Sequence, residues 1–218
     1  VPVSINLSRA DFQMMDPLTE LNQAMRKNGL RRSLVHVEIT ESALSKDVAG
    51  LKRAIHNFRQ AGYEVWMDDF GSGYSSLNYL KNFEFDEIKL DMIFMKDFDE
   101  ASKKILTACV KMAKDLGIHT LAEGVETKQQ LDFLQSIGCE RIQGFYYSKP
   151  LPTGEFAKLV AEKGIEIENW QQSKFYQRVG LVDLVSDKPT CLVLDDGSHF
   201  RLLYVNEEFQ KEVKRAPA

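Results

Sequence analysis

Two periods of apolar residues alternate along the chain. Short runs rich in Val, Ile and Leu, typical of buried strands, are separated by longer segments in which apolar residues recur at helical spacing. The strand candidates cover residues 3–6, 34–40, 64–69, 87–91, 119–125 and 141–145. The helix candidates between them cover residues 18–29, 48–62, 103–117 and 127–138. Three of these helices are expected to stop at a glycine: Gly62, Gly117 and Gly138.

The repeated strand–helix units predict an α/β fold with a parallel sheet, because parallel strands need crossover connections that are usually helices. Six units are visible, which leaves two architectures open: an open doubly wound sheet, or most of a (β/α)8 barrel. No GxGxxG or GxxxxGK[ST] signature follows the first strand, which argues against a dinucleotide site and a P-loop.

The pattern changes after residue 164. Residues 150–164 predict a turn and a last helix, and a polar helical connector follows. Residues 190–213 predict a hairpin with Asp196-Gly197 at its turn, followed by the start of a helix. We therefore divide the chain into a barrel domain, 1–164, and an extension, 165–218. A single hairpin is too small to be stable alone, so it is either docked on the barrel or the start of a second domain.

Composition narrows the class of function. The 218 residues carry a net charge of −4, which argues against broad electrostatic binding of nucleic-acid polymers. No apolar run is long enough to span a membrane, and the first residues lack the order typical of a signal peptide. The three cysteines are far apart, as in a reduced cytoplasmic protein. A phosphate substrate still fits if metal ions offset local carboxylates.

Oxygen-bearing side chains recur where the strand candidates end. They are Asn6, Glu38, Glu41, Asp68, Asp69, Asp91, Glu123 and Glu126, with Gln143 on the last strand. The carboxyl ends of parallel strands are where α/β folds build their sites. Oxygen ligands without a matching histidine or cysteine set favour a hard cation such as Mg²⁺, Mn²⁺ or Ca²⁺.

Three residues at these strand ends suggest phosphoryl chemistry. Asp68 and Asp69 would face opposite ways on an ideal strand, but a turning backbone lets both reach ions. One carboxylate that bridges two cations, with its neighbour on the second, is how a two-metal hydrolytic site is assembled. Lys89 could position water or offset charge in the transition state.

Each of these residues also has a structural interpretation. Taken alone, an Asp-Asp pair at a strand end is more often a solvated cap than a metal site. Taken alone, Lys89 is more often an ion-pair partner of Asp91, and Gln143 is more often a partner of backbone groups. The four histidines have no ligand spacing, and we interpret them as structural. The set as a whole favours a site, because its members come from successive units at one end of the sheet.

Six segments in series carry a family resemblance: "SINLS", "VEITES", "MDDFGSGYSSL", "FDEIKLD", "TLAEGVET" and "QGFYYSKPL". From about residue 1 to residue 152 the sequence resembles the EAL-domain family of bacterial cyclic di-GMP phosphodiesterases. The resemblance implies a (β/α)8-type, TIM-like barrel, here incomplete at its N-terminus, with a small C-terminal α+β extension. It implies hydrolysis of cyclic di-GMP to linear pGpG with two Mg²⁺ or Mn²⁺ ions.

The resemblance also implies roles for individual residues. Asn6, Glu38 and Asp68 match ligands of one ion, Asp68 bridges to a second ion, and Asp69 and Glu123 match residues that hold the second. Lys89 matches the lysine that contacts the attacking water, and Asp91 and Gln143 match residues that line the site. Glu41 and Glu126 resemble glutamates that brace the loop containing Gly71, Ser72 and Gly73, where Ser72 replaces the more usual threonine. Of these, Lys89, Glu41, Glu123 and Gln143 are the candidate catalytic residues.

The Glu-Ala-Leu motif that names the family is absent from this sequence. We expect the chain to begin after it, to lack one metal-ligand glutamate, and to have impaired activity by itself. The expected partners are cyclic di-GMP, a second copy in a homodimer, and an upstream signalling or diguanylate-cyclase-like domain in a parent protein that could be membrane-anchored. The C-terminal hairpin weakly resembles the start of a PAS-type sensor domain.

Two other functions stay open. The domain could bind cyclic di-GMP as a receptor without cleaving it, although such relatives usually lose acidic residues and this chain keeps those that can be checked. Alternatively, it could be a structural or dimerisation module, with Cys109, Met112 and Leu116 on an exposed helical stripe.

Overall fold

The structure, a computed structural model, describes residues 2–40, 43, 48–72, 76–165, 169–183, 186–195 and 197–215. Glu41, Gly73 and Asp196, which the sequence analysis names, lie outside the described residues.

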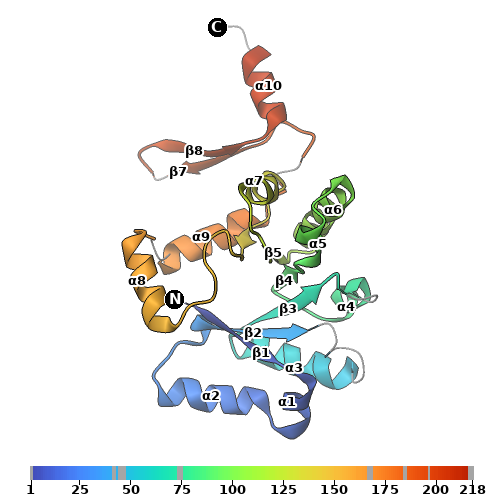
Figure 1. The fold of residues 1–218 in the computed structure, drawn as a ribbon, viewed down its shortest axis with the longest axis vertical. Coiled ribbons are helices and arrows are strands. Elements are labelled where there is room, and N and C mark those ends of the chain that lie inside the picture. The colour runs from blue at the N-terminus through green and yellow to red at the C-terminus, as the bar shows by residue number, and fades with distance from the viewer. Residues whose placement is uncertain are drawn as a thin grey trace.

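A parallel sheet with strand order β1-β2-β3-β4-β5-β6 forms the centre of the molecule (Figure 1). Its strands are β1 (Val3–Leu7), β2 (Val35–Thr40), β3 (Glu64–Phe70), β4 (Glu87–Leu90), β5 (His119–Ala122) and β6 (Arg141–Ile142). Every neighbouring pair is parallel, which confirms the predicted α/β class. The sheet curves as a half-barrel, with β1 and β6 at its two edges.

Four strands are shorter than the sequence predicts, β2 and β4 by one residue each and β5 and β6 by three. β5 ends at Ala122 and β6 at Ile142, so Glu123 and Gln143 lie just beyond their strands. The backbone turns at Gly124, which has a positive φ of 70°. Hydrogen bonds still join the two segments, from Gln143 N to Ala122 O at 2.8 Å and from Val125 N to Gln143 O at 3.2 Å.

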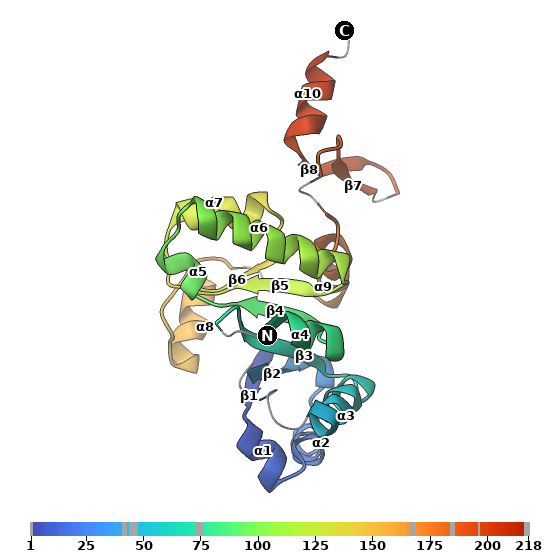
Figure 2. The same ribbon diagram turned by 90° about the vertical axis from the view of Figure 1, so that its right-hand side faces the viewer.

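Helices surround the half-barrel. They are α1 (Arg9–Met14), α2 (Pro17–Lys27), α3 (Val48–Gln60), α4 (Ser76–Asn82), α5 (Ile93–Lys96), α6 (Glu100–Asp115), α7 (Lys128–Ser136), α8 (Thr153–Glu162) and α9 (Trp170–Gly180). Figures 1 and 2 show α1–α3 at the β1–β3 end of the sheet and α5–α7 beside β4–β6. The apolar periodicity predicted the longer helices but not α1 or α5, which have 6 and 4 residues and are too short to show it.

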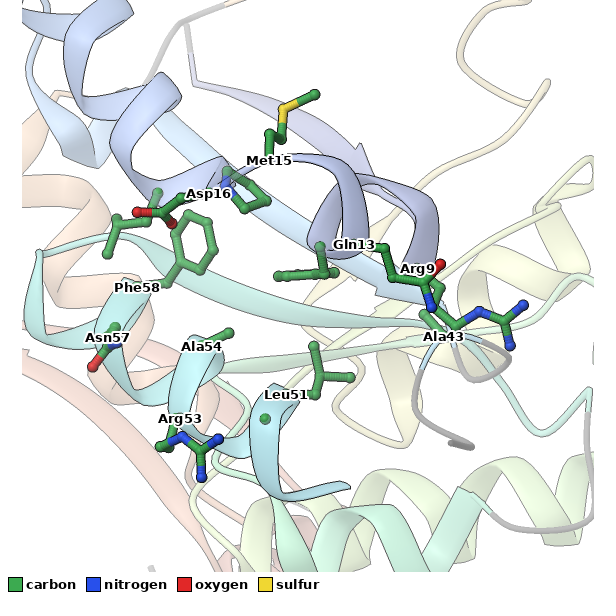
Figure 3. Close-up of a pocket in the computed structure, with 14 residues that line it drawn as sticks. Arg9, Gln13, Met15, Asp16, Ala43, Leu51, Arg53, Ala54, Asn57 and Phe58 are labelled. Carbon is green, nitrogen blue, oxygen red and sulfur yellow. The ribbon is translucent and has the colours of Figure 1, made fainter. Parts of the chain in front are cut away.

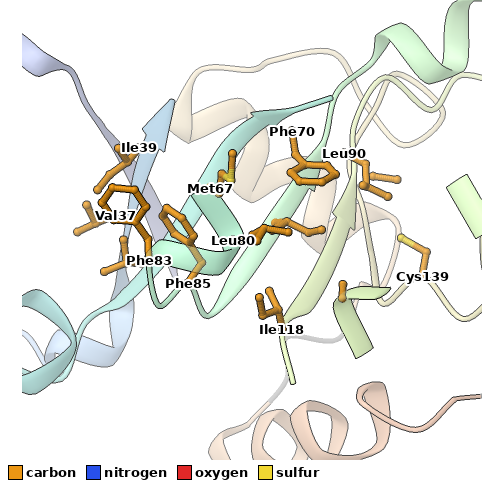
Figure 4. Close-up of a cluster of buried hydrophobic side chains, with 14 of the residues drawn as sticks. Val37, Ile39, Met67, Phe70, Leu80, Phe83, Phe85, Leu90, Ile118 and Cys139 are labelled. Carbon is orange, nitrogen blue, oxygen red and sulfur yellow. The ribbon is translucent and has the colours of Figure 1, made fainter. Parts of the chain in front are cut away.

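The core lies between the sheet and these helices. Alternate strand residues such as Val37, Ile39 and Met67 point outward and are fully buried there (Figure 4). Because side chains alternate along a strand, the residues between them face the inside of the half-barrel. On β2 these inward residues are His36, Glu38 and Thr40, so the inner face is polar.

The C-terminal elements form a separate unit. β7 (Cys191–Asp195) and β8 (Phe200–Val205) make the predicted antiparallel hairpin, and α10 (Glu207–Arg215) follows it. Figures 1 and 2 both show this unit standing away from the half-barrel. By contrast, α9 contacts the barrel, where Gln177 Nε2 donates to Glu64 Oε1 at 2.9 Å. The domain boundary at residue 164 stays a prediction.

Of the helices in the described ranges, none is long and apolar enough to cross a lipid bilayer.

Candidate functional site

Four of the predicted residues meet at a single point near the carboxyl ends of the strands. Nζ of Lys89, on β4, lies 2.8 Å from Glu38 Oε2, 2.8 Å from Asp68 Oδ1 and 2.8 Å from Glu123 Oε1. The carboxylates come from β2, from β3 and from the residue after β5. We call Glu38, Asp68, Lys89 and Glu123 the rim cluster.

The rim cluster is buried and carries excess negative charge. The side chains of Lys89 and Glu38 are 6% and 5% exposed. Burial by itself lowers the pKa of Lys89, but contacts with Asp68, Glu123 and Glu38 outweigh it and raise the pKa well above its usual value, so the amine is protonated. Burial raises the pKa of Glu123, and Lys89 only partly offsets this. If all three acids are ionised, one ammonium leaves two negative charges without a partner.

The backbone of β3 is bent where the two aspartates lie. Met67 pairs with Ile88 and Phe70 pairs with Leu90, so Asp68 and Asp69 together stand opposite the single residue Lys89. This is a β-bulge, a device that re-aims side chains next to active sites. Asp69 has a φ of 57°, the left-handed conformation that residues other than glycine seldom adopt. The bulge explains how consecutive acids can serve one site, where an ideal strand would point them apart.

Local contacts fix the chain on either side of the rim cluster. Asn6 is the register partner of Glu38 in the β1–β2 ladder, which places it on the same inner face. After the bulge, Ser72 Oγ donates to Asp69 O at 2.9 Å, and Gly71 has a φ of 97°. These contacts form a tight turn directly behind Asp69.

Three other predicted residues lie near this end of the sheet with different contacts. Asp91 does not pair with Lys89; its Oδ1 accepts from Ile93 N at 2.7 Å at the start of α5. Gln143 and Glu126 are exposed. The backbone N–H of Glu126 donates to Gln130 Oε1 at 2.9 Å. The bracing role of Glu126 and the lining role of Gln143 stay predictions.

Gln130 is a site neighbour that the sequence analysis missed. Its side chain is buried, accepts from the N–H groups of Glu126 and Thr127, and donates to Met95 O at 3.0 Å. The signal was present, because Thr127 and Gln130 form a T-x-x-Q capping box at the start of α7. Gln130 thereby joins the loop after Glu123 to helix α5.

The residues of the rim fit a hard divalent cation. Asp68 Oδ1 is buried, and its ion-pair partner is the ammonium of Lys89 at 2.8 Å. Within the described residues, no three Asp, Glu, His or Cys side chains are already arranged around a position that a metal ion could occupy. We attribute this to Nζ of Lys89, which lies where the carboxylates converge and stands in for a cation.

A groove in the described structure lies away from the rim cluster. It has a volume of about 520 Å³ and lies between α1, the start of α2, and α3 (Figure 3). Its floor is apolar, with Leu51, Ala54 and Phe58, and Arg9 and Arg53 are at its border. No member of the rim cluster lines it, so we do not assign the site to this groove.

Comparison with known proteins agrees with these features. The profile of the EAL domain family matches residues 1–150. The cyclic di-GMP phosphodiesterase NbdA of Pseudomonas aeruginosa is 35% identical over 152 residues, which are 69% of this chain and 19% of that protein. The EAL domain of Mycobacterium smegmatis DcpA superposes with a TM-score of 0.70 at 32% identity, covering 74% of each chain.

A second similar structure contains both a metal and a nucleotide. It is Klebsiella pneumoniae BlrP1 in a complex with manganese and cyclic di-GMP, with a TM-score of 0.65 and 34% identity over 68% of this chain and 39% of that chain. The present chain spans about a fifth of the length of the curated relatives it matches.

Proposed function

The chain belongs to the EAL-domain family, and from this premise we propose that it takes part in the metal-dependent hydrolysis of cyclic di-GMP to linear pGpG. The observation that carries the proposal is the rim cluster, where the buried carboxylate of Glu38 and the partly buried carboxylates of Asp68 and Glu123 converge on one lysine, three acids for one base. An excess of buried carboxylate is costly for a fold, and a site for cations accounts for it.

The proposed ligands divide between two ions, Mg²⁺ or Mn²⁺. Asn6, Glu38 and Asp68 would hold the first, and Asp69 and Glu123 would hold the second, with Asp68 shared. Support for this division comes from the Asn6–Glu38 register and from the bulge that presents both aspartates opposite Lys89. Bound ions of this kind polarise a phosphate and lower the pKa of a bound water.

Lys89 has a different proposed role. Its ammonium is buried and positively charged, so it can donate to the attacking water or to a phosphate oxygen once it leaves a carboxylate. Charge placed before the reaction in a buried site stabilises a transition state more than charge exposed to water. Lys89 should therefore affect kcat more than KM.

A receptor that binds cyclic di-GMP without cleaving it is the second candidate. The contacts of Lys89 favour the receptor in one respect, because an ammonium that satisfies the carboxylates competes with the metal that hydrolysis needs.

Homodimerisation, the partner domain and the cytoplasmic location stay predictions. On the α6 stripe, Cys109 and Met112 pack partly against the core and Leu116 is 55% exposed.

The experiment that separates these functions measures pGpG formed from cyclic di-GMP by the natural protein, with Mn²⁺ and with EDTA. We expect product with Mn²⁺ and none with EDTA. Binding of cyclic di-GMP without product at any Mn²⁺ concentration would contradict the enzyme and support the receptor. Neither binding nor product would reject both.

A further inference from the structure

The short helix α5 lies against the turn that follows the two aspartates. A Cβ atom added to Gly71 would lie 2.6 Å from Cε2 of Phe94 and would overlap the ring at Cζ as well. Real Cβ contacts are essentially never that close, so the ring rests directly on the backbone of residue 71. Phe94 is half-buried and also packs against the core.

The same segment lies against the turn that follows Glu123. A Cβ atom on Gly124 would lie 2.5 Å from Met92 Cβ and 3.2 Å from Met92 Cα. Both glycines have positive φ values, 97° at Gly71 and 70° at Gly124. Each therefore combines a turn that favours glycine with a close approach that only glycine allows.

Helix α5 is itself fixed at both ends. At its start, Asp91 Oδ1 accepts from Ile93 N at 2.7 Å. At its end, Met95 is 5% exposed and its carbonyl accepts from Gln130 Nε2 at 3.0 Å. The other end of the Gln130 amide accepts from the N–H of Glu126, in the loop that carries Glu123. The segment therefore joins two loops that are far apart in sequence.

We propose that residues 92–96 act as a spacer that sets the separation between the Asp68–Asp69 bulge and Glu123. Phe94 positions the bulge through Gly71, and Met92 positions Glu123 through Gly124. Both are positioning residues, because their contacts are with the loops and not with the reacting atoms. The importance of this spacing for metal binding rests on the proposed function, whereas the spacer contact itself is a property of the metal-free chain.

A two-metal site responds sharply to small changes in the distances between its ligands. Two ions that share a ligand require oxygen atoms at fixed separations, and an error of about 1 Å can cost roughly 100-fold in rate. A leucine at position 94 is shorter than the ring and leaves a gap over Gly71. Asp69 is already in an uncommon backbone conformation, so the turn should relax when the ring no longer rests on it.

The first test uses the metal-free chain and follows amide hydrogen exchange in two segments, 66–72 and 120–126. Phe94→Leu should speed exchange in the first segment, where Ser72 N donates to Asp69 O. Phe98→Leu is the matched control. Phe98 is also half-buried, but its ring packs edge-on against Phe133, with ring centroids 5.5 Å apart, and not on Gly71. Equal exchange in the two variants would overturn the positioning role of Phe94.

The second test measures Mn²⁺ affinity by calorimetry. We expect Phe94→Leu to weaken binding by at least about fivefold, which corresponds to about 1 kcal/mol, and Phe98→Leu to leave it unchanged. Phe94→Met, whose unbranched side chain reaches farther than that of leucine, should lie between and serves if the leucine variant does not fold. A lower Tm with unchanged exchange and unchanged affinity would show that Phe94 is only a packing residue.

A double-mutant cycle isolates the ring contact. Gly71→Ala adds a Cβ against the ring and also strains a left-handed residue. The strain is present with or without the ring, so Gly71→Ala should lose less affinity and less exchange protection in the Phe94→Leu background. Additive losses would contradict the proposal. If the unchanged chain binds no Mn²⁺, the metal assignment fails, and the exchange arm of the cycle still decides whether Phe94 positions the turn.

Discussion

The two ends of the half-barrel's inner face carry buried charged groups of different kinds. At the carboxyl ends of the strands, the rim cluster has three acids and one base. At the amino ends, acids and bases are paired: Arg141 with Glu87, His36 with Glu64 at 3.0 Å, and His119 with Glu140 at 2.5 Å. We call these six residues the base cluster.

The base cluster is also closed by other side chains. Trp66 stacks on His36 with ring centroids 4.4 Å apart, and the guanidinium of Arg141 lies 5.3 Å from the Trp66 centroid. Helix α9 adds Gln177, which donates to Glu64. Each acid there has its own basic side chain beside it, and no register shift interrupts the strands at this end of the sheet.

The comparison shows that buried charge alone does not identify a site. What separates the rim cluster is the excess of acid over base together with a bulged, left-handed backbone at Asp69. Proteins retain such strain and imbalance where function requires them. Substitutions at the rim should therefore change metal binding and catalysis, and substitutions at the base should change stability.

The largest expected effect is at Asp68. Asp68→Ala in the natural protein should lower the rate of pGpG formation by at least about 100-fold, because the lost carboxylate is the proposed ligand of both ions and several kcal/mol of charge stabilisation depend on them. Its thermal stability should fall little, since the change removes one excess negative charge. Parental turnover with Mg²⁺ would show that the assignment of two ions is wrong.

The next effect is at Lys89. Lys89→Met should destabilise the metal-free chain by about 3–5 kcal/mol, because it leaves buried carboxylates without their cation. Added Mn²⁺ should recover more stability in this variant than in the parent chain, as measured by urea unfolding. In the natural protein, kcat should fall far more than KM rises. An effect on KM alone would reassign Lys89 to substrate binding.

At the base cluster, the expected effect is on acid stability. Burial by itself raises the pKa of Glu64, but His36 and Arg141 outweigh it and lower the pKa to about 2. A lowered carboxyl pKa contributes stability above the unfolded value, 4.5 for this group, and that stability is lost as the pH falls from 4.5 towards 2.

In the parent chain, the free energy of unfolding should fall by about 2 kcal/mol between pH 4.5 and pH 2 because of Glu64, after allowance for partial exposure of its side chain. Glu64→Gln should remove this part of the pH dependence. Mn²⁺ affinity at neutral pH should not change. Urea unfolding at several pH values gives the first result and calorimetry the second. A weaker metal affinity in Glu64→Gln would break the distinction between the two ends.

The smallest expected effect is at Ser72. Ser72→Thr keeps the hydroxyl that donates to Asp69 O and should leave Mn²⁺ affinity unchanged. Ser72→Ala removes that hydrogen bond and should cost about 1 kcal/mol of stability in the turn. Hydrogen exchange of residues 66–72 would detect this change. Identical exchange in the alanine and threonine variants would show that the hydroxyl does not hold the bulge.

Sequence periodicity predicted the strands and the long helices, because burial imposes both the strand period and the helix period on apolar residues. The positions of the acids relative to the strands predicted which end of the sheet carries them. Periodicity did not predict the polar inner face at the amino ends of the strands. There, His36 on β2, Glu64 on β3 and Glu87 on β4 each occupy an inward-facing position of their strand. Ion pairs between strands distant in sequence leave no periodic signal. The bulge at Asp69 and the contact of Phe94 with Gly71 are set by packing, which a linear pattern does not contain.

Calorimetric titration of the metal-free chain with Mn²⁺ tests the central claim most directly, with Asp68→Ala and Glu64→Gln measured beside it. We expect the parent chain and Glu64→Gln to bind Mn²⁺ with the same affinity and Asp68→Ala to lose the tighter binding event. No binding by the parent chain, or equal binding by Asp68→Ala, would contradict the claim that the unbalanced rim cluster is a metal site.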